Sequence, residues 1–197
     1  MCNTLAQTAF TFALGGLGFW VAAYLRYRGQ EPVSGKFTFG LITVVAGLTS
    51  TLLGGVIADR LRKKNSGAYF LVSGVGMLIA FPFFIAALFI PFPLAWVPMF
   101  IAIFFCFLNT GPSNTALANV AHPSVRASAF AFNIMIIHLL GDAAAFPTIG
   151  YIGGHTSMNI AFLLVGFMML LAGVIWLFGA RYLGADTDAV EAASRTS

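Results

Sequence analysis

Residues 126–150 have the sequence RASAFAFNIMIIHLLGDAAAFPTIG, which is apolar and long enough to cross a bilayer as one helix. Its middle carries two ionisable residues, His138 and Asp142. Because they are four residues apart, a helix places them on one face. An ionisable side chain at membrane depth is costly and usually faces a bundle interior or a water-filled path. The stretch therefore predicts a membrane-spanning helix with a functional face, enclosed by the other five apolar segments of the chain.

The composition excludes a soluble domain. Hydrophobic residues make up 59% of the chain and charged residues only 8%, whereas soluble domains carry roughly 25% charged residues. The net charge of +4 is then a matter of membrane topology, and no nucleic-acid partner is expected. Cys2 is near the terminus and Cys106 lies within an apolar segment, so both are predicted to be free thiols. We expect no cofactor and no metal site.

Six apolar segments have about the length that a spanning helix needs. They cover residues 4–25, 37–58, 68–91, 94–118, 126–151 and 159–182. The predicted fold is an all-α membrane bundle over residues 1–183. The tail that follows, residues 184–197, is small and acidic, and we expect it to be disordered on the cytoplasmic side.

Basic residues indicate how the bundle is oriented. Arg60, Arg62, Lys63 and Lys64 directly follow the second apolar segment, and cytoplasmic loops carry an excess of Lys and Arg. With this loop in the cytoplasm, six spans place both termini there as well. The sequence thus predicts a multi-pass protein of a cell membrane, either inner or plasma, with both ends cytoplasmic.

The fourth apolar segment contains a polar stripe. Side chains at four-residue spacing pair Asn109 with Ser113 and Thr110 with Asn114. Pro112 cannot donate to the carbonyl of Leu108, and broken backbone beside polar side chains is how membrane transporters build binding sites. Interhelical hydrogen bonds, worth about 1 kcal/mol, explain the stripe equally well. Both interpretations stay open.

Two further polar residues are candidates for lining a cavity. Thr8 belongs to a face of the first segment that also carries Thr11 and Gly15, and close helix packing is the alternative explanation for that face. Asn133 lies in the fifth segment, upstream of His138.

The loop after the second segment resembles a signature of the major facilitator superfamily, Gly-x-x-x-Asp-Arg/Lys-x-Gly-x-Arg/Lys. Here it is Gly55-Val-Ile-Ala-Asp59-Arg60, followed by Lys63 and Lys64, with Arg62 at the usual glycine. Asp59 is placed to meet the positive N-terminus of a neighbouring helix, and Arg60 can pair with a carboxylate. The expected cytoplasmic latch consists of Gly55, Asp59, Arg60, Lys63, Lys64 and Arg126. A plain topogenic basic loop is the alternative.

Motifs in the fourth and fifth segments resemble the spinster branch of that superfamily, transporters of lysophospholipids and sphingosine-type lipids. They are Asn109-Thr-Gly-Pro112 and His138-Leu-Leu-Gly-Asp142-Ala. Ala145 and Phe146 stand where that branch typically has Ser-Pro. The resemblance covers nearly the whole chain and implies one half of a major facilitator fold, helices seven to twelve.

The resemblance implies a secondary active transporter of a lipid-like or small amphipathic substrate, working in the lipid bilayer by alternating access. Its partner is expected to be an N-terminal six-helix half or a second six-helix unit. Asp142, with His138 as its neighbour, is the expected site for coupling to a proton or another cation, or for contact with the substrate, and a proton is the favoured choice. The alternatives are a non-transporting scaffold half and an intramembrane enzyme using His138 and Asp142. No catalytic motif accompanies that pair, which disfavours the enzyme.

Overall fold

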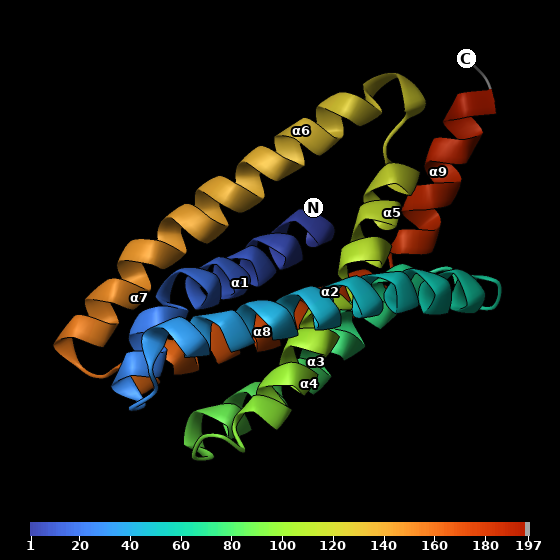
Figure 1. The fold of residues 1–197 in the computed structure, drawn as a ribbon. Helices are drawn as coiled ribbons and strands as arrows, with labels where there is room; N and C mark the ends of the chain where they lie inside the picture. The colour runs from blue at the N-terminus through green and yellow to red at the C-terminus, as the bar shows by residue number, and fades with distance from the viewer. Residues whose placement is uncertain (196–197) are drawn as a thin grey trace.

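A computed structural model of the chain describes residues 1–195 as a bundle of helices (Figure 1). The first four α-helices are α1 (Cys2–Tyr27), α2 (Pro32–Arg62), α3 (Ala68–Phe89) and α4 (Trp96–Phe107). They are followed by α5 (Thr110–Val120), the short 3-10 helix η1 (Pro123–Val125), α6 (Arg126–Ile137) and the π-helical turn η2 (His138–Asp142). The last three helices are α7 (Ala143–His155), α8 (Met158–Gly179) and α9 (Leu183–Arg195). No strand occurs within residues 1–195, which confirms the all-α fold class.

Within residues 1–195, six helical segments are long and apolar enough to cross a membrane, as predicted. The fourth is the combination of α4 and α5, and the fifth runs from η1 through α7, Pro123–His155. The second, Val33–Arg62, extends further at both ends than residues 37–58. Hydropathy marks only the part of a helix that lies in hydrocarbon, whereas capping fixes where the helix begins. The Glu31 carboxylate accepts hydrogen bonds from the backbone N–H groups of Val33 and Ser34, and Pro32 occupies the first helical position.

The centre of the bundle is formed by α1, α3 and α8. The middle helix is α8, which packs against both α1 and α3. Their largest buried side chains are aromatic. Tyr24 stacks on Phe162 with ring centroids 4.2 Å apart, and Phe84 stacks on the same ring at 6.4 Å. Trp176 is also fully buried. Such pairs add to the stabilisation from area burial, so this core is the rigid frame on which the other helices are placed.

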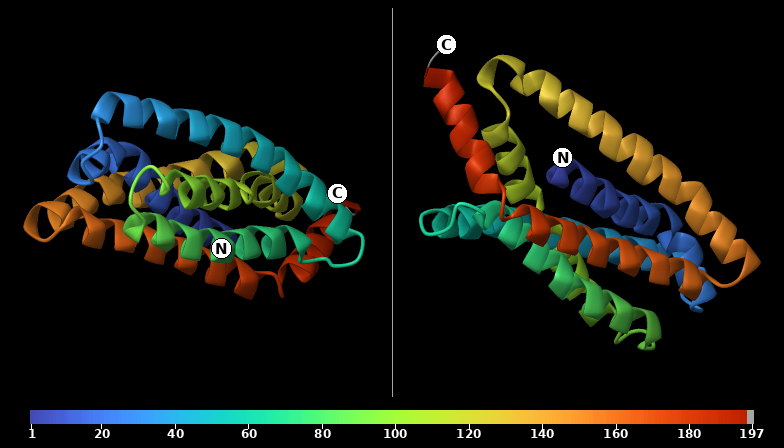
Figure 2. Two further views of the ribbon diagram at one scale, coloured as in Figure 1. Left: turned by 60° about the horizontal axis from the view of Figure 1, so that its bottom comes forward. Right: turned by 180° about the vertical axis from the view of Figure 1, so that it is seen from behind.

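Two spanning segments remain on the outside of the bundle. In the most apolar part of each span, only 22% of the residues of α2 and 17% of those of the fifth span are buried. The share is between 44% and 50% for the other four spans. Figure 2 shows α2 and the α6–α7 rod at the edges of the bundle. Both carry large exposed apolar side chains, including Leu48 and Leu52 on α2 and Phe132 and Met135 on α6.

The expectation of a disordered tail is wrong for residues 184–195, which belong to α9. Leu183 and Thr187 are 1% and 2% exposed, and they share one face because they are four residues apart. The helix packs against α5, and Asp186 in its first turn suits the positive end of the helix dipole. The buried face of α9 is narrow, and most residues around it are small or acidic. The sequence pattern therefore did not indicate a packed helix. Residues 196–197 lie outside the described part of the chain.

Candidate functional site

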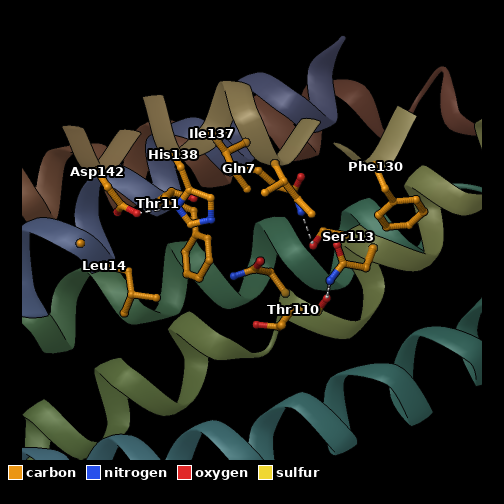
Figure 3. A pocket seen from close by; sticks show the side chains of 14 residues that line it. Gln7, Thr11, Leu14, Thr110, Ser113, Phe130, Ile137, His138 and Asp142 are labelled. Carbon is orange, nitrogen blue, oxygen red and sulfur yellow. Dashed lines mark hydrogen bonds and ion pairs between the residues drawn. The ribbon is translucent and has the colours of Figure 1, made fainter. Parts of the chain in front are cut away.

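A cavity of about 580 Å³ lies between α1, α5, α6 and η2 (Figure 3). Its polar lining consists of Gln7, Thr11, Asn109, Thr110, Ser113, Asn114, His138 and Asp142. Its apolar lining consists of Phe10, Leu14, Phe130, Ile134 and Ile137, with Gly15 completing the wall. The fold therefore brings the fourth-span stripe and the fifth-span ionisable pair, which are far apart in sequence, to one space.

His138 and Asp142 lie at the two ends of the π-helical turn η2 in the middle of the fifth span. The N–H of Ala143 donates to the carbonyl of His138, five residues back. Single π-helical turns within α-helices occur frequently at functional sites. The side chains meet as the four-residue spacing predicts, with 2.6 Å between Nδ1 of His138 and Oδ2 of Asp142. Within residues 1–195 no Lys or Arg forms an ion pair with Asp142.

The two side chains differ in exposure. That of His138 is 58% exposed and that of Asp142 is 25% exposed, so His138 lies toward the open side of the cavity and Asp142 deeper, against α1. The close approach of α1 depends on Gly15. A Cβ atom at that position would collide with Oδ1 and Cγ of the Asp142 carboxylate. Gly15 is therefore a positioning residue for Asp142, in agreement with the close helix packing that is one interpretation of its face of α1.

A network of hydrogen bonds between buried side chains includes Gln7 and Ser113 from the cavity wall. Trp176 Nε1 donates to Asn3 Oδ1 at 3.0 Å, and Asn3 Nδ2 donates to the backbone carbonyl of Ser113 at 3.0 Å. Gln7 Nε2 donates to Ser113 Oγ at 3.1 Å, and Asn133 Nδ2 donates to Gln7 Oε1 at 2.7 Å. The Gln7–Ser113 bond is drawn in Figure 3. This hydrogen-bond network joins α8, α1, α5 and α6, so Ser113 and Asn133 act as interhelical links.

The break between α4 and α5 places unpartnered polar atoms beside the cavity. Asn109 is 1% exposed, and its amide nitrogen donates to the Cys106 carbonyl. Its Oδ1 and the hydroxyl of Thr110 are buried without a hydrogen-bond partner. Asn114 Nδ2 donates to the Thr110 carbonyl at 3.0 Å. A buried polar atom without a partner costs free energy, so Asn109 and Thr110 contribute unsatisfied hydrogen-bonding atoms to the wall of the cavity.

Other predicted site features lie elsewhere. Thr8 does not line the cavity, and its hydroxyl donates to the Thr4 carbonyl within α1. The Leu108 carbonyl that Pro112 leaves free faces Gly54 of α2, where a Cβ atom would collide with it. That carbonyl is therefore used for close packing of α2 on the helix break.

The residues of the expected latch lie at one end of the bundle. Asp59 Oδ1 accepts a hydrogen bond from the Tyr69 hydroxyl at 3.0 Å, and the Arg62 guanidinium lies 5.5 Å from the centre of the Tyr69 ring. Arg60, Lys63 and Lys64 are exposed, as is Arg126. Gly55 lies close to Gly111 of α5, where absent side chains let the two helices approach. Within the described residues no ion pair joins Asp59 to Arg126, so Tyr69 is the observed partner.

Comparison with known proteins identifies the relatives of this chain. It is 33% identical over 218 residues to protein spinster homolog 3 of Danio rerio, covering 96% of this chain and 44% of the relative. A sphingosine-1-phosphate transporter of the same organism is 32% identical and covers 94% and 42%. The chain is related to the spinster proteins. A probable sphingolipid transporter of Arabidopsis thaliana, spinster homolog 2, is 30% identical and covers 90% and 37%.

The spinster-related chain also shares their fold. A crystal structure of a bacterial homolog to the human lysosomal transporter spinster, inward-facing and unoccupied, matches with a TM-score of 0.68 at 18% identity. The match covers 95% of this chain and 47% of the other, which confirms the major facilitator architecture. No family profile matches the chain. The chain spans less than half the length of these relatives. Two of the relatives are named as transporters, which supports the prediction that the protein is not an enzyme.

Proposed function

We propose that the chain is one six-helix half of a secondary transporter of lipid-like molecules. The observation that carries this proposal is the cavity itself, which combines an apolar wall with unpartnered hydrogen-bonding atoms and one ionisable pair. An amphipathic molecule fits such a space because its tail contacts Phe10, Phe130 and Ile134 while its head group meets Asn109 and Thr110. The names of the relatives, sphingolipid and sphingosine-1-phosphate transporters, support a lipid substrate.

The second half of the transporter would cover the open side of this cavity. Thr110 lines both the main cavity and a second hollow of about 480 Å³ along α2. The two hollows therefore form one surface that includes α2 and α6, the least buried spans. Lipid tails cannot satisfy the polar atoms of that surface, whereas another six-helix unit can enclose them. An N-terminal six-helix half and a second six-helix unit both fit this role.

Alternating access would follow from movement of this bundle against its partner around the cavity. In the proposed cycle, the hydrogen-bonded pair of His138 and Asp142 is the place where a proton is taken up and released. Protonation of the carboxylate removes the charge that the cavity must accommodate, and loss of that proton requires access to water. A conformation open to water and a closed one therefore bind the proton with different strength, which is the condition for coupling. The loop at residues 63–67 and both ends of the chain would face the cytoplasm.

The function is tested by uptake of a fluorescent lysophospholipid into proteoliposomes. The chain is reconstituted alone and together with the part of the Danio rerio spinster homolog 3 that it does not cover. We expect uptake only from the pair, because the chain alone leaves the cavity open to lipid. Asn109→Leu should reduce uptake by the pair, whereas Asn65→Leu, in the exposed loop, should not. Absence of uptake from a correctly assembled pair would favour a non-transporting scaffold.

A further inference from the structure

A smaller cavity of about 180 Å³ lies at the end of the bundle where α9 packs against α5. Its lining includes Arg62 at the end of α2, Asn119 in α5, Arg126 at the start of α6 and Glu191 in α9. Figure 1 shows α9 beside α5, with the connection from α5 to α6 near the C-terminal end. The cavity is separate from the one described above, and its lining residues come from α2, α5, η1, α6 and α9.

The two arginines leave positive charge in this cavity. Within the described residues neither Arg62 nor Arg126 forms an ion pair with a carboxylate. Nη1 of Arg62 is buried without a hydrogen-bond partner, although its guanidinium also lies over the Tyr69 ring. Two carboxylates are nearby: Glu191 faces the cavity, and Asp59 binds the Tyr69 hydroxyl. A buried guanidinium nitrogen without an acceptor is costly, so the arrangement favours an anion as its partner.

We propose that this cavity binds a phosphate group, held by the guanidinium groups of Arg62 and Arg126 with the Asn119 amide as a neutral donor. The planar guanidinium matches phosphate oxygens with two parallel hydrogen bonds. The cavity lies where spanning segments end, at Arg62 and Val120, and where the next begins, at Pro123. This is the depth of lipid head groups, so an anionic phospholipid is one source of the phosphate, and free phosphate is the other.

The test measures binding to the detergent-solubilised chain by calorimetry. The probes are short-chain phosphatidylglycerol, short-chain phosphatidylcholine and inorganic phosphate. We expect phosphatidylglycerol to bind more tightly than phosphatidylcholine, whose choline cation faces two arginines. Arg62→Gln and Arg126→Gln should each weaken binding about tenfold or more, since each removes a charge-assisted hydrogen-bond donor. Arg181→Gln removes an exposed positive charge outside this cavity and should leave binding unchanged.

Each outcome decides the proposal. Preference for phosphatidylglycerol over inorganic phosphate assigns a lipid source, and equal binding of the two assigns free phosphate. Equal binding of the two lipids without any binding of phosphate, or arginine variants as tight as Arg181→Gln, would overturn the site. If the arginine variants do not fold, Asn119→Leu decides: it removes the neutral donor from the cavity wall and should weaken phosphate binding severalfold, and unchanged binding contradicts the proposal. The outcome is independent of transport.

Discussion

Replacing Gly15 by alanine tests whether α1 positions the carboxylate of Asp142. The added Cβ atom would collide with Oδ1 and Cγ of Asp142, so the carboxylate or the helix must move. Overpacking of this kind costs about 1–3 kcal/mol, whereas glycine to alanine in a helix interior gains about 0.5–1 kcal/mol. Gly18→Ala is the matched control, because a Cβ atom there has nothing within 4 Å. The free energies of unfolding of the two variants should differ by about 1–3 kcal/mol, or roughly 5- to 150-fold in the unfolding equilibrium.

The assay is reversible unfolding in mixed micelles, followed by tryptophan fluorescence. It is repeated in the Asp142→Ala background, where both colliding atoms are absent and the remaining contact, the Cα atom of residue 142 at 3.4 Å, is ordinary. There Gly15→Ala should cost no more than Gly18→Ala. An equal penalty for Gly15→Ala with and without the Asp142 carboxylate would refute the reasoning, because the cost would then arise from packing of the backbone.

Three further changes probe the parts around the site. Gln7→Leu should lower the free energy of unfolding by about 1–3 kcal/mol, because it leaves Ser113 and Asn133 without their buried partner; denaturation of the variant checks this, and a stability equal to wild type would contradict the role of the hydrogen-bond network. Hydrogen bonds from the backbone N–H groups after Glu31 lower the pKa of its carboxyl below the ordinary 4.5, so its cap supports the start of α2 above that pH and is lost as pH falls through the lowered pKa. Protection against hydrogen exchange at the start of α2, corrected for the pH dependence of intrinsic amide exchange, should fall in wild type as pH falls through that lowered pKa. Glu31→Gln should show the lower protection at all pH values. Leu183→Ala should weaken the packing of α9 on α5 by a free energy of about 2–5 kcal/mol. Limited proteolysis should then cleave within α9, after residue 183, at an earlier time than it cleaves the membrane spans.

Features that depend on local spacing could be predicted from the sequence. Six apolar segments of spanning length give six spanning helices, and four-residue spacing is sufficient to bring His138 to Asp142. The same spacing pairs Asn109 with Ser113 and Thr110 with Asn114 in one stripe, and all four residues line the cavity. These contacts lie within one turn of helix, so they need no knowledge of how the helices pack.

Features that depend on packing between distant segments could not be predicted. Gln7 meets Ser113 across 106 residues, and nothing in the sequence near either residue specifies that partner. A spacing clue was present, since Asn3 and Gln7 are four residues apart and both are buried. The freed Leu108 carbonyl turns to Gly54 because α2 packs there. The fold of α9 was missed for a different reason: its stability comes from α5 and not from its own composition.

The central claim is that the cavity around Asp142 couples a proton to movement of a lipid-like molecule. The most direct measurement is uptake of fluorescent lysophospholipid at several external pH values, in proteoliposomes that hold the chain together with the uncovered part of the Danio rerio relative. Asp142→Asn keeps the size and removes the charge, and Asp188→Asn, at an exposed position of α9, is the matched control. We predict that Asp188→Asn keeps the pH response of wild type and that Asp142→Asn, folded and inserted, loses it. A full pH response in Asp142→Asn would contradict the account and leave Asp142 as a packing residue.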